Sequence, residues 1–566
     1  MTTVQHPRAL QWLPAQLVLL VSVGCGGGSS PPPPPQPVYS VGGTVVGLHE
    51  SGVVLASGTN SVTLAENATT FTLPTQLAAG TSYSVLVQAQ PADVNCRVAD
   101  GSGDVTADVS DIQVICVGAW AWINSTSTGL GQNPGIYGTL GVSAASNWPG
   151  GRTAAAHAQD GDGNVWVFGG AGWDSIEYTT AMNDLWKYTA ASGQWTWMSG
   201  SAIATASFSG SYGTLGLPAA GNLPGARTGA ALWADRQGRL WLFGGSGFDA
   251  NGASGPLNDL WMFEPVSGLW AWMGGATTVS SPGTSGAQGV PAASNIPGAR
   301  AYAATWTDAN GDLWLFGGSP SAPVALDAGH SDLWKFSVAS GQWTWMSGDP
   351  QYYSAGSYGV RGTAAAGNAP PGRVGASSWL DPQGHLWMFG GTYTIRSDPL
   401  PDTTCCSYEL NDLWNYDPAS GQWTWMSGSN TPDGVASYAV LGVESSQAVP
   451  GVRENAVSWA APDGTLWLYG GGSADSQYLS DVWRYRPSSG QWTWMGGTST
   501  PSLYGTYGTK GVPAADNLPP ASAAGVGWVD AAGRFWLFGG AGLVLAPNSG
   551  GSNNELDRND LWTYFP

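Results

Sequence analysis

The sequence predicts an all-β protein in which a ring of six repeated four-stranded units, a β-propeller, follows a small β-sandwich module. Three observations carry this prediction: a double-glycine segment that recurs six times, a Trp-x-Trp strand that recurs with it, and short alternating strands ahead of the repeats. The composition agrees, because 84 glycines and 32 tryptophans among 566 residues accompany only 10% charged residues.

The first segment resembles a bacterial secretory signal, with an apolar run too short to span a membrane. It ends at Gly24-Cys25, which resembles the cleavage site of a lipoprotein signal, although Ser22 stands where that family usually has Leu. In that family the cysteine is lipid-modified; ordinary cleavage within the glycine run is the alternative. We expect residues 1–25 to be a signal peptide ending at a lipidated Cys25.

Residues 26–38 form the expected tether. Glycine and serine make its first part flexible, and five consecutive prolines favour a stiff polyproline II spacer. We therefore expect an exported protein of the bacterial cell envelope, a lipoprotein that is periplasmic or surface-exposed and contacts the membrane only through its lipid.

Four cysteines remain after Cys25: Cys96, Cys116, Cys405 and Cys406. An even number in an exported chain predicts disulfides. Neither Cys96 with Cys116 nor Cys405 with Cys406 has the spacing of a tetrahedral metal site. A free buried thiol is the alternative for any one of them. Whether the adjacent Cys405 and Cys406 form a vicinal disulfide stays open.

Residues 39–117 alternate polar and apolar positions in short runs separated by turn residues at roughly ten-residue spacing. The pattern predicts a small antiparallel sandwich. It resembles the immunoglobulin-like or transthyretin-like modules that bacteria place between an anchor and a working domain. No residue in this module suggests chemistry.

The remaining region, residues 118–566, repeats one unit. Each unit has a double glycine after its second strand, an Asp-Leu-Trp-like third strand and a Trp-x-Trp fourth strand. The double glycines begin at Gly169, Gly244, Gly317, Gly390, Gly470 and Gly539. These marks resemble the kelch repeat and the related propeller of galactose oxidase, and the resemblance implies a six-bladed kelch-type propeller. It implies much less about function, because one fold hosts many functions.

The ends of the repeat region predict how the ring closes. The chain stops at Pro566 without the Trp-x-Trp strand of the sixth unit, and a surplus copy stands at Trp120 and Trp122, ahead of the first unit. We expect residues 119–123 to supply the missing outer strand, which would leave no exposed edge.

Catalysis finds no support in the residues. The copper enzymes of the resembled family use two His and two Tyr, whereas His157, His330 and His385 lie in three different units with no pair at ligand spacing. Asp160 opens a DGDGN segment that resembles a calcium loop, but its twelfth position is Ala171 instead of Glu, so a tight turn is the better interpretation. We expect no enzyme activity, no cofactor and no metal.

Binding is the expected function. The formal charge of -20 argues against nucleic acid. The turns after the first and third strands are short, whereas the connections on the opposite face are long, and binding usually resides in loops on a rigid scaffold. We expect a monomer that binds a protein or a glycan through the long-loop face. The alternatives are a carbohydrate- or small-molecule-active enzyme and a purely structural envelope protein.

Five arginines occupy one repeat position at the start of the first strand, and the sixth unit has Ser522 there. As a collar around the channel mouth they would bind anions. We favour a clamp, in which each arginine pairs with the Asp of its own Asp-Leu-Trp triplet and Asp560 makes other contacts. The five candidates are Arg152, Arg227, Arg300, Arg373 and Arg453.

Overall fold

The structure is a computed structural model. It describes residues 35–48, 51–91, 94–125, 133–176, 179–203, 208–320, 329–350, 354–395, 406–473, 477–501, 504–514, 516–544 and 554–566. Within these ranges all the regular elements are β-strands. The described residues contain no helix long and apolar enough to cross a membrane. The leader, most of the tether and Cys405 lie outside the described residues, as does the side chain of Cys406.

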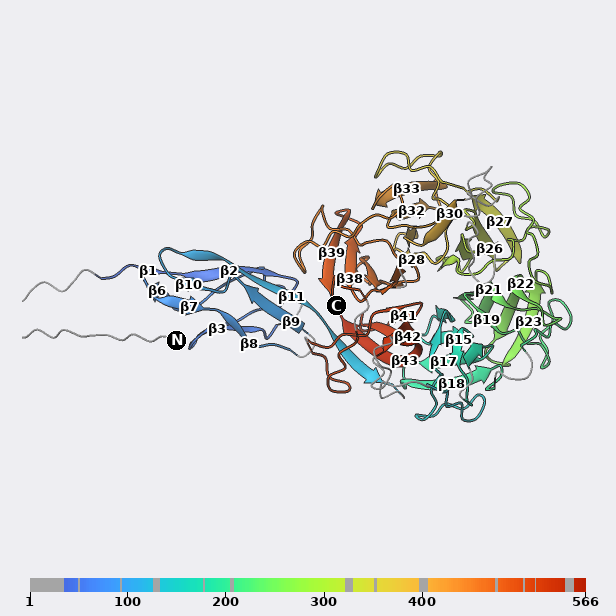
Figure 1. Cartoon of the computed structure of the whole chain (residues 1–566), viewed down its shortest axis with the longest axis horizontal. Helices are drawn as coiled ribbons and strands as arrows, with labels where there is room; N and C mark the ends of the chain where they lie inside the picture. The colour runs from blue at the N-terminus through green and yellow to red at the C-terminus, as the bar shows by residue number, and fades with distance from the viewer. Residues whose placement is uncertain are drawn as a thin grey trace, which may run out of the picture.

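The N-terminal module consists of two main sheets and two short strand pairs, β1 (Val38–Tyr39) with β6 (Leu77–Ala78) and β7 (Ser82–Ser84) with β10 (Ser102–Asp104) (Figure 1). Its buried apolar residues form one core. One sheet holds β2 (Val41–Val46), β5 (Thr70–Thr72), β9 (Val94–Ala99) and the first part of β11 (Val109–Asn124). Strands β2 and β11 are parallel, so the prediction of a wholly antiparallel module is wrong at this pair. The other holds β3 (Val54–Ser57), β4 (Asn60–Thr63) and β8 (Leu86–Ala89). Val41, Leu55 and Ile112 are fully buried in the core, as strand alternation requires.

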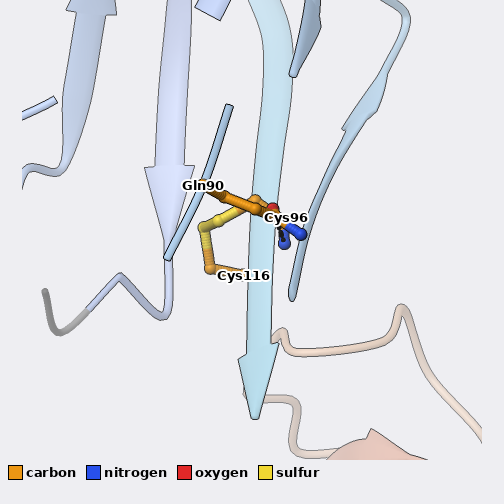
Figure 2. The surroundings of a disulfide bond; sticks show 3 residues. All are labelled: Gln90, Cys96 and Cys116. Atoms are coloured by element: carbon orange, nitrogen blue, oxygen red, sulfur yellow. Dashed lines mark hydrogen bonds between the residues drawn. A yellow bond between two sulfur atoms is a disulfide. The ribbon is translucent and has the colours of Figure 1, made fainter. Parts of the chain in front are cut away.

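The predicted disulfide between Cys96 and Cys116 is present (Figure 2). The two residues stand directly opposite each other on β9 and β11, and Gln90 accepts a hydrogen bond from the backbone N–H of Cys96 at 2.8 Å. The bond therefore fixes the register of these two strands.

The repeats form six antiparallel units arranged in a ring, each built around four strands (Figure 1). Unit 2 carries the additional short strand β19 (Arg227–Thr228), and unit 6 continues through β11 into the sheet of the module. Units 1 to 3 are β13 (Ala156–Gln159), β14 (Val165–Phe168), β17 (Leu185–Thr189) and β18 (Gln194–Ser199); β20 (Ala231–Ala234), β21 (Leu240–Phe248), β22 (Ser254–Glu264) and β23 (Leu269–Gly274); and β24 (Ala304–Thr307), β25 (Leu313–Phe316), β26 (Leu333–Ser337) and β27 (Gln342–Ser347).

Units 4 to 6 continue the series around the ring. They are β28 (Ser377–Leu380), β29 (Leu386–Phe389), β32 (Leu413–Asp417) and β33 (Gln422–Ser427); β34 (Val457–Ala460), β35 (Leu466–Tyr469), β38 (Val482–Arg486) and β39 (Gln491–Gly496); and β41 (Val526–Val529), β42 (Phe535–Val544), β43 (Asn554–Phe565) and the end of β11.

Aromatic side chains fill the seams between neighbouring units. At the seam of units 1 and 2, the ring of Trp166 meets Phe263 and the ring of Phe168 meets Trp270, with centroids 6.1 and 5.6 Å apart. Burying such a side chain contributes roughly 1.5–3 kcal/mol. The first tryptophan of each Trp-x-Trp strand is buried in this core, whereas the second is half-buried.

The N-terminal closing strand is where the sequence predicts it. Ala119 to Asn124 of β11 pair antiparallel with Phe565 to Leu561 of β43 and form the outermost strand of unit 6. In Figure 1 this segment of β11 runs from the module into the ring beside β43. The ring is therefore closed between its last unit and its first.

The loop that precedes each unit covers the outer strand of that same unit. In unit 2 the N–H of Gly216 donates to the carbonyl of Trp272 at 2.7 Å, and Ala219 forms a bridge with Trp270. The same bridge recurs in the other units as Ala144–Trp195, Ala292–Trp343, Ala365–Trp423, Ser445–Trp492 and Ala514–Trp120.

Candidate binding face and axial channel

The two faces of the ring are built differently. On one face, tight turns join the first strand to the second and the third to the fourth. On the other, small hairpins rise above the ring. They are formed by β15 (Ala171–Trp173) with β16 (Thr179–Ala181), the adjoining ends of β21 and β22, β30 (Thr392–Ile395) with β31 (Cys406–Glu409), β36 (Gly472–Ser473) with β37 (Gln477–Tyr478), and the adjoining ends of β42 and β43.

The short-turn face uses its aspartates structurally. In the DGDGN turn, Asp160 Oδ1 accepts the N–H of Asp162 and of Asn164 at 3.1 and 2.9 Å, and Oδ2 accepts Trp166 Nε1 at 2.9 Å. The same Asp–Trp bond recurs in units 2, 3, 4 and 6. These oxygens hold a turn, and the described residues contain no group of three His, Cys, Asp or Glu side chains that could hold a metal ion.

A buried ion pair lies at the base of the long-loop face. In unit 2, Arg227 Nη1 and Nη2 donate to Asp259 Oδ1 and Oδ2 at 2.7 and 2.8 Å, in a bidentate arrangement. Tyr212 Oη and Trp261 Nε1 both donate to Oδ2, at 2.8 and 2.7 Å. The same Arg–Asp pair recurs in units 1, 3, 4 and 5 as Arg152–Asp184, Arg300–Asp332, Arg373–Asp412 and Arg453–Asp481.

Each arginine also holds the backbone around it. Arg227 Nε donates to the carbonyl of Gly225 and Nη1 to that of Gly244, both at 2.9 Å. Burial acts to lower the pKa of Arg227, but the charge and hydrogen bonds of Asp259 overcome this effect and raise it. The contacts agree with the clamp, and none of the five arginines lines the axial cavity, where an anion-binding collar would place them.

Unit 6, where Ser522 replaces the arginine, obtains its cation from another position. Arg558, two residues before Asp560, donates from Nη1 to the carbonyl of Pro520 at 3.2 Å, and its Nε lies 4.0 Å from Asp560 Oδ1. Tyr469, where the other units have Phe, donates to the same Pro520 carbonyl at 3.0 Å.

Asp560 therefore makes other contacts, as predicted. It accepts bonds from Tyr507 Oη at 3.0 Å and Trp562 Nε1 at 2.8 Å. Sequence reasoning missed Arg558; the available signal was an arginine where the equivalent residues of other units include Met182 and Leu257.

Unit 3 keeps the Arg–Asp pair but differs from the other units in two residues near it. It has Ser285 where units 1 and 2 have Tyr137 and Tyr212, and it has His330 at the position equivalent to Arg558. His330 is 2% exposed, and its Nδ1 lies 3.9 Å from Asp332 Oδ1. Burial and, secondarily, the charge of Arg300 lower the pKa of His330 to about 3.

Six residues, one from each unit, form a closed hoop of backbone hydrogen bonds around the axis of the ring. Each lies two residues after the arginine position of its unit. Each N–H donates to the carbonyl of the preceding unit at 2.7 to 3.1 Å, and the first unit closes the circle by donating to the sixth. All six residues have positive φ, between 52° and 69°. They are Ala154, Gly229, Tyr302, Gly375, Asn455 and Ala524.

The hoop brings selected side chains to the channel. The ring of Tyr302 lies over Gly229, where a Cβ would approach it to 2.9 Å, and the amide of Asn455 lies over Gly375. A bulky residue at positive φ is uncommon and strained, so Tyr302 is held there by its surroundings.

An axial cavity of about 370 Å³ lies along the inner strands, and the hoop residues line part of it. Its walls are mostly alanine and glycine, with hydroxyl groups from residues that include Thr305, Ser378 and Ser458. The hydroxyls of Ser378 and Ser458 donate to Thr305 and Ser378 carbonyls, linking neighbouring units at 3.1 and 3.0 Å. Unit 1 alone adds an imidazole and a long amide here, His157 and Gln159, both exposed to the channel.

These features define a β-propeller with kelch-like units, and the comparisons with known proteins agree. Residues 214–434 match the KLHDC2/KLHL20/DRC7 Kelch-repeats domain, and residues 459–493 match the Kelch motif. No curated protein matches the chain at a significant level. The two matched stretches are kelch repeats, which supports a protein-interaction scaffold.

Proposed function

We propose that this chain is an exported binding scaffold, a six-bladed kelch-type propeller that holds a protein or glycan partner on its long-loop face. Three features support the blade number: six units built around four strands each among the described residues, a hoop with one residue from each, and a closing strand. The module of residues 39–117, an immunoglobulin-like or transthyretin-like sandwich in this proposal, holds the propeller away from its anchor.

The difference between the two faces carries the proposal. The hairpins and the mouth of the hoop lie on one face, above buried Arg–Asp clamps that make their bases rigid. A rigid base lowers the entropy lost when a loop binds a partner. On the opposite face the strands are joined by tight turns, and Asp160 in the turn of unit 1 is already hydrogen-bonded to the backbone.

A matched pair of substitutions tests the face. Asn251 is exposed at the tip of the β21–β22 hairpin, and Val266 is exposed in the β22–β23 turn on the opposite face. Residues 39–566 are used to capture partners from the native envelope or from a glycan array. Asn251→Arg should weaken capture while Val266→Arg leaves it unchanged; the reverse pattern would place binding on the short-turn face.

Anchoring is part of the proposal and has its own test. The Gly24-Cys25 junction followed by the Gly/Ser/Pro tether supports a lipoprotein of the bacterial envelope. Metabolic labelling with a fatty acid should mark the wild-type chain and not Cys25→Ala. Equal labelling of both would show that the chain is not lipidated at this cysteine.

A further inference from the structure

Strand β11 belongs to two sheets at once. Its residues up to Gly118 pair with β2 and β9 in the module, and from Ala119 onward they pair with β43 in unit 6. Gly118 and Ala119 are consecutive, so no linker separates the module from the strand that closes the ring. A shift of β11 within the module is therefore transmitted directly to the closing strand.

The closing segment is held in the ring by specific contacts. The carbonyl of Trp120 accepts Asn517 Nδ2 at 2.8 Å and the N–H of Ala514 at 3.2 Å. Its indole is 3% exposed and lies 4.9 Å from the ring of Tyr564 and 5.3 Å from that of Tyr469. These contacts require β11 to stay in one register.

Within the module, ladders to β2 and β9 hold β11 in this register, and the disulfide adds a covalent constraint to the second of them. Cys116 lies three residues before Ala119, and its partner Cys96 is on β9. Among the described strands β9 pairs with β11 alone, so it is an edge strand, and edge strands separate from a sheet more readily than central ones. The covalent bond holds β9 against β11 at the point where β11 leaves the module.

We propose that the Cys96–Cys116 disulfide is a redox-controlled latch on closure of the propeller. A dithiol reductant supplies two electrons and two protons, the S–S bond breaks to two thiols, and the dithiol becomes a cyclic disulfide. Strand β9 then separates from β11 and the closing strand loses its fixed register against β43. This inference does not depend on the identity of any bound partner.

The tryptophans give a readout that belongs to the ring alone. Apart from Trp12 in the leader, every tryptophan lies at position 120 or beyond, and residues 39–117 contain none. Tryptophan emission therefore reports unfolding of the propeller and not of the module. A change in that signal on reduction is a change in the ring.

The test is thermal unfolding of the full chain, followed by tryptophan emission with and without dithiothreitol, after alkylation and mass measurement confirm that Cys96 and Cys116 are reduced. We expect reduction to lower the midpoint by about 3 °C or more. The double variant Cys96→Ser/Cys116→Ser should melt like the reduced wild type and should not respond to dithiothreitol. A wild-type midpoint that reduction leaves unchanged would overturn the proposal. A drop of equal size when dithiothreitol is added to the double variant would also overturn it, because that result assigns the effect to other cysteines.

Hydrogen exchange keeps the proposal testable if the double variant does not fold. Reduction of the wild type should lower amide protection at residues 119–124 by about tenfold or more, while β23, the equivalent outer strand of unit 2, keeps its protection. Equal protection at both strands before and after reduction would show that ring closure is independent of the bond.

Discussion

Units 2 and 6 solve one problem with different residues. Each must neutralise a buried aspartate at the start of its third strand, Asp259 or Asp560. Unit 2 uses a bidentate arginine from the short strand β19 (Arg227–Thr228) that precedes β20, whereas unit 6 uses Arg558 from the aspartate's own strand, at 4.0 Å. The comparison teaches that the repeat conserves the charge balance of the buried site and not the position of the cation.

The largest effect is expected from removing the unit 2 cation. Arg227→Ala leaves Asp259 buried without its partner, and both side chains are fully buried in the wild type. Breaking such a pair costs about 3–5 kcal/mol of unfolding free energy. Urea unfolding measures this; a loss below about 1 kcal/mol would mean that Tyr212 and Trp261 suffice to hold the aspartate.

A smaller effect is expected in unit 6, because Arg558 contacts Asp560 at longer range. Arg558→Leu should cost about 1–3 kcal/mol. Adding Tyr469→Phe and Ser522→Arg to this variant rebuilds the unit 2 arrangement and should recover about half of the loss or more. If the triple variant is no more stable than Arg558→Leu alone, the two arrangements are not interchangeable.

In unit 3 the residue near the buried aspartate is a histidine, so the stability of this unit should depend on pH. The pKa of His330 is lowered from 6.5 to about 3, so between these values the unfolded chain binds a proton that the folded chain does not. The contribution of neutral His330 is present above pH 6.5 and is lost as pH falls, by about 2 kcal/mol at pH 5.

The matched variant is His330→Leu, because Leu257, Leu410 and Leu479 occupy this position in three other units. Its unfolding free energy should fall less than that of the wild type between pH 7 and pH 5. Parallel pH profiles of the two proteins, measured by urea unfolding, would contradict the assignment.

The sequence predicts the repeats and the closing strand because both depend on residue types at regular spacing. It predicts the Cys96–Cys116 bond because an even number of cysteines in an exported chain favours pairing. The kelch prediction is confirmed for the matched stretches. The hoop could not be predicted, because its members range from Gly229 to Tyr302 and share a backbone conformation instead of a side chain. Arg558 was missed because it supplies, from a different strand, the cation that is absent at the Ser522 position. Only the three-dimensional contacts reveal this. What binds on the long-loop face stays a prediction.

The bridge between each unit's preceding loop and its outer strand affects how the protein behaves at high local concentration. A propeller presents the outermost strand of every unit at its circumference, and an unpaired strand there is a template for another chain. Because all six outer strands are already bridged, from Ala144–Trp195 to Ala514–Trp120, the circumference offers neighbouring molecules little backbone to pair with. Many copies could then crowd side by side without sheet-to-sheet aggregation, although all the regular elements of the described residues are β-strands.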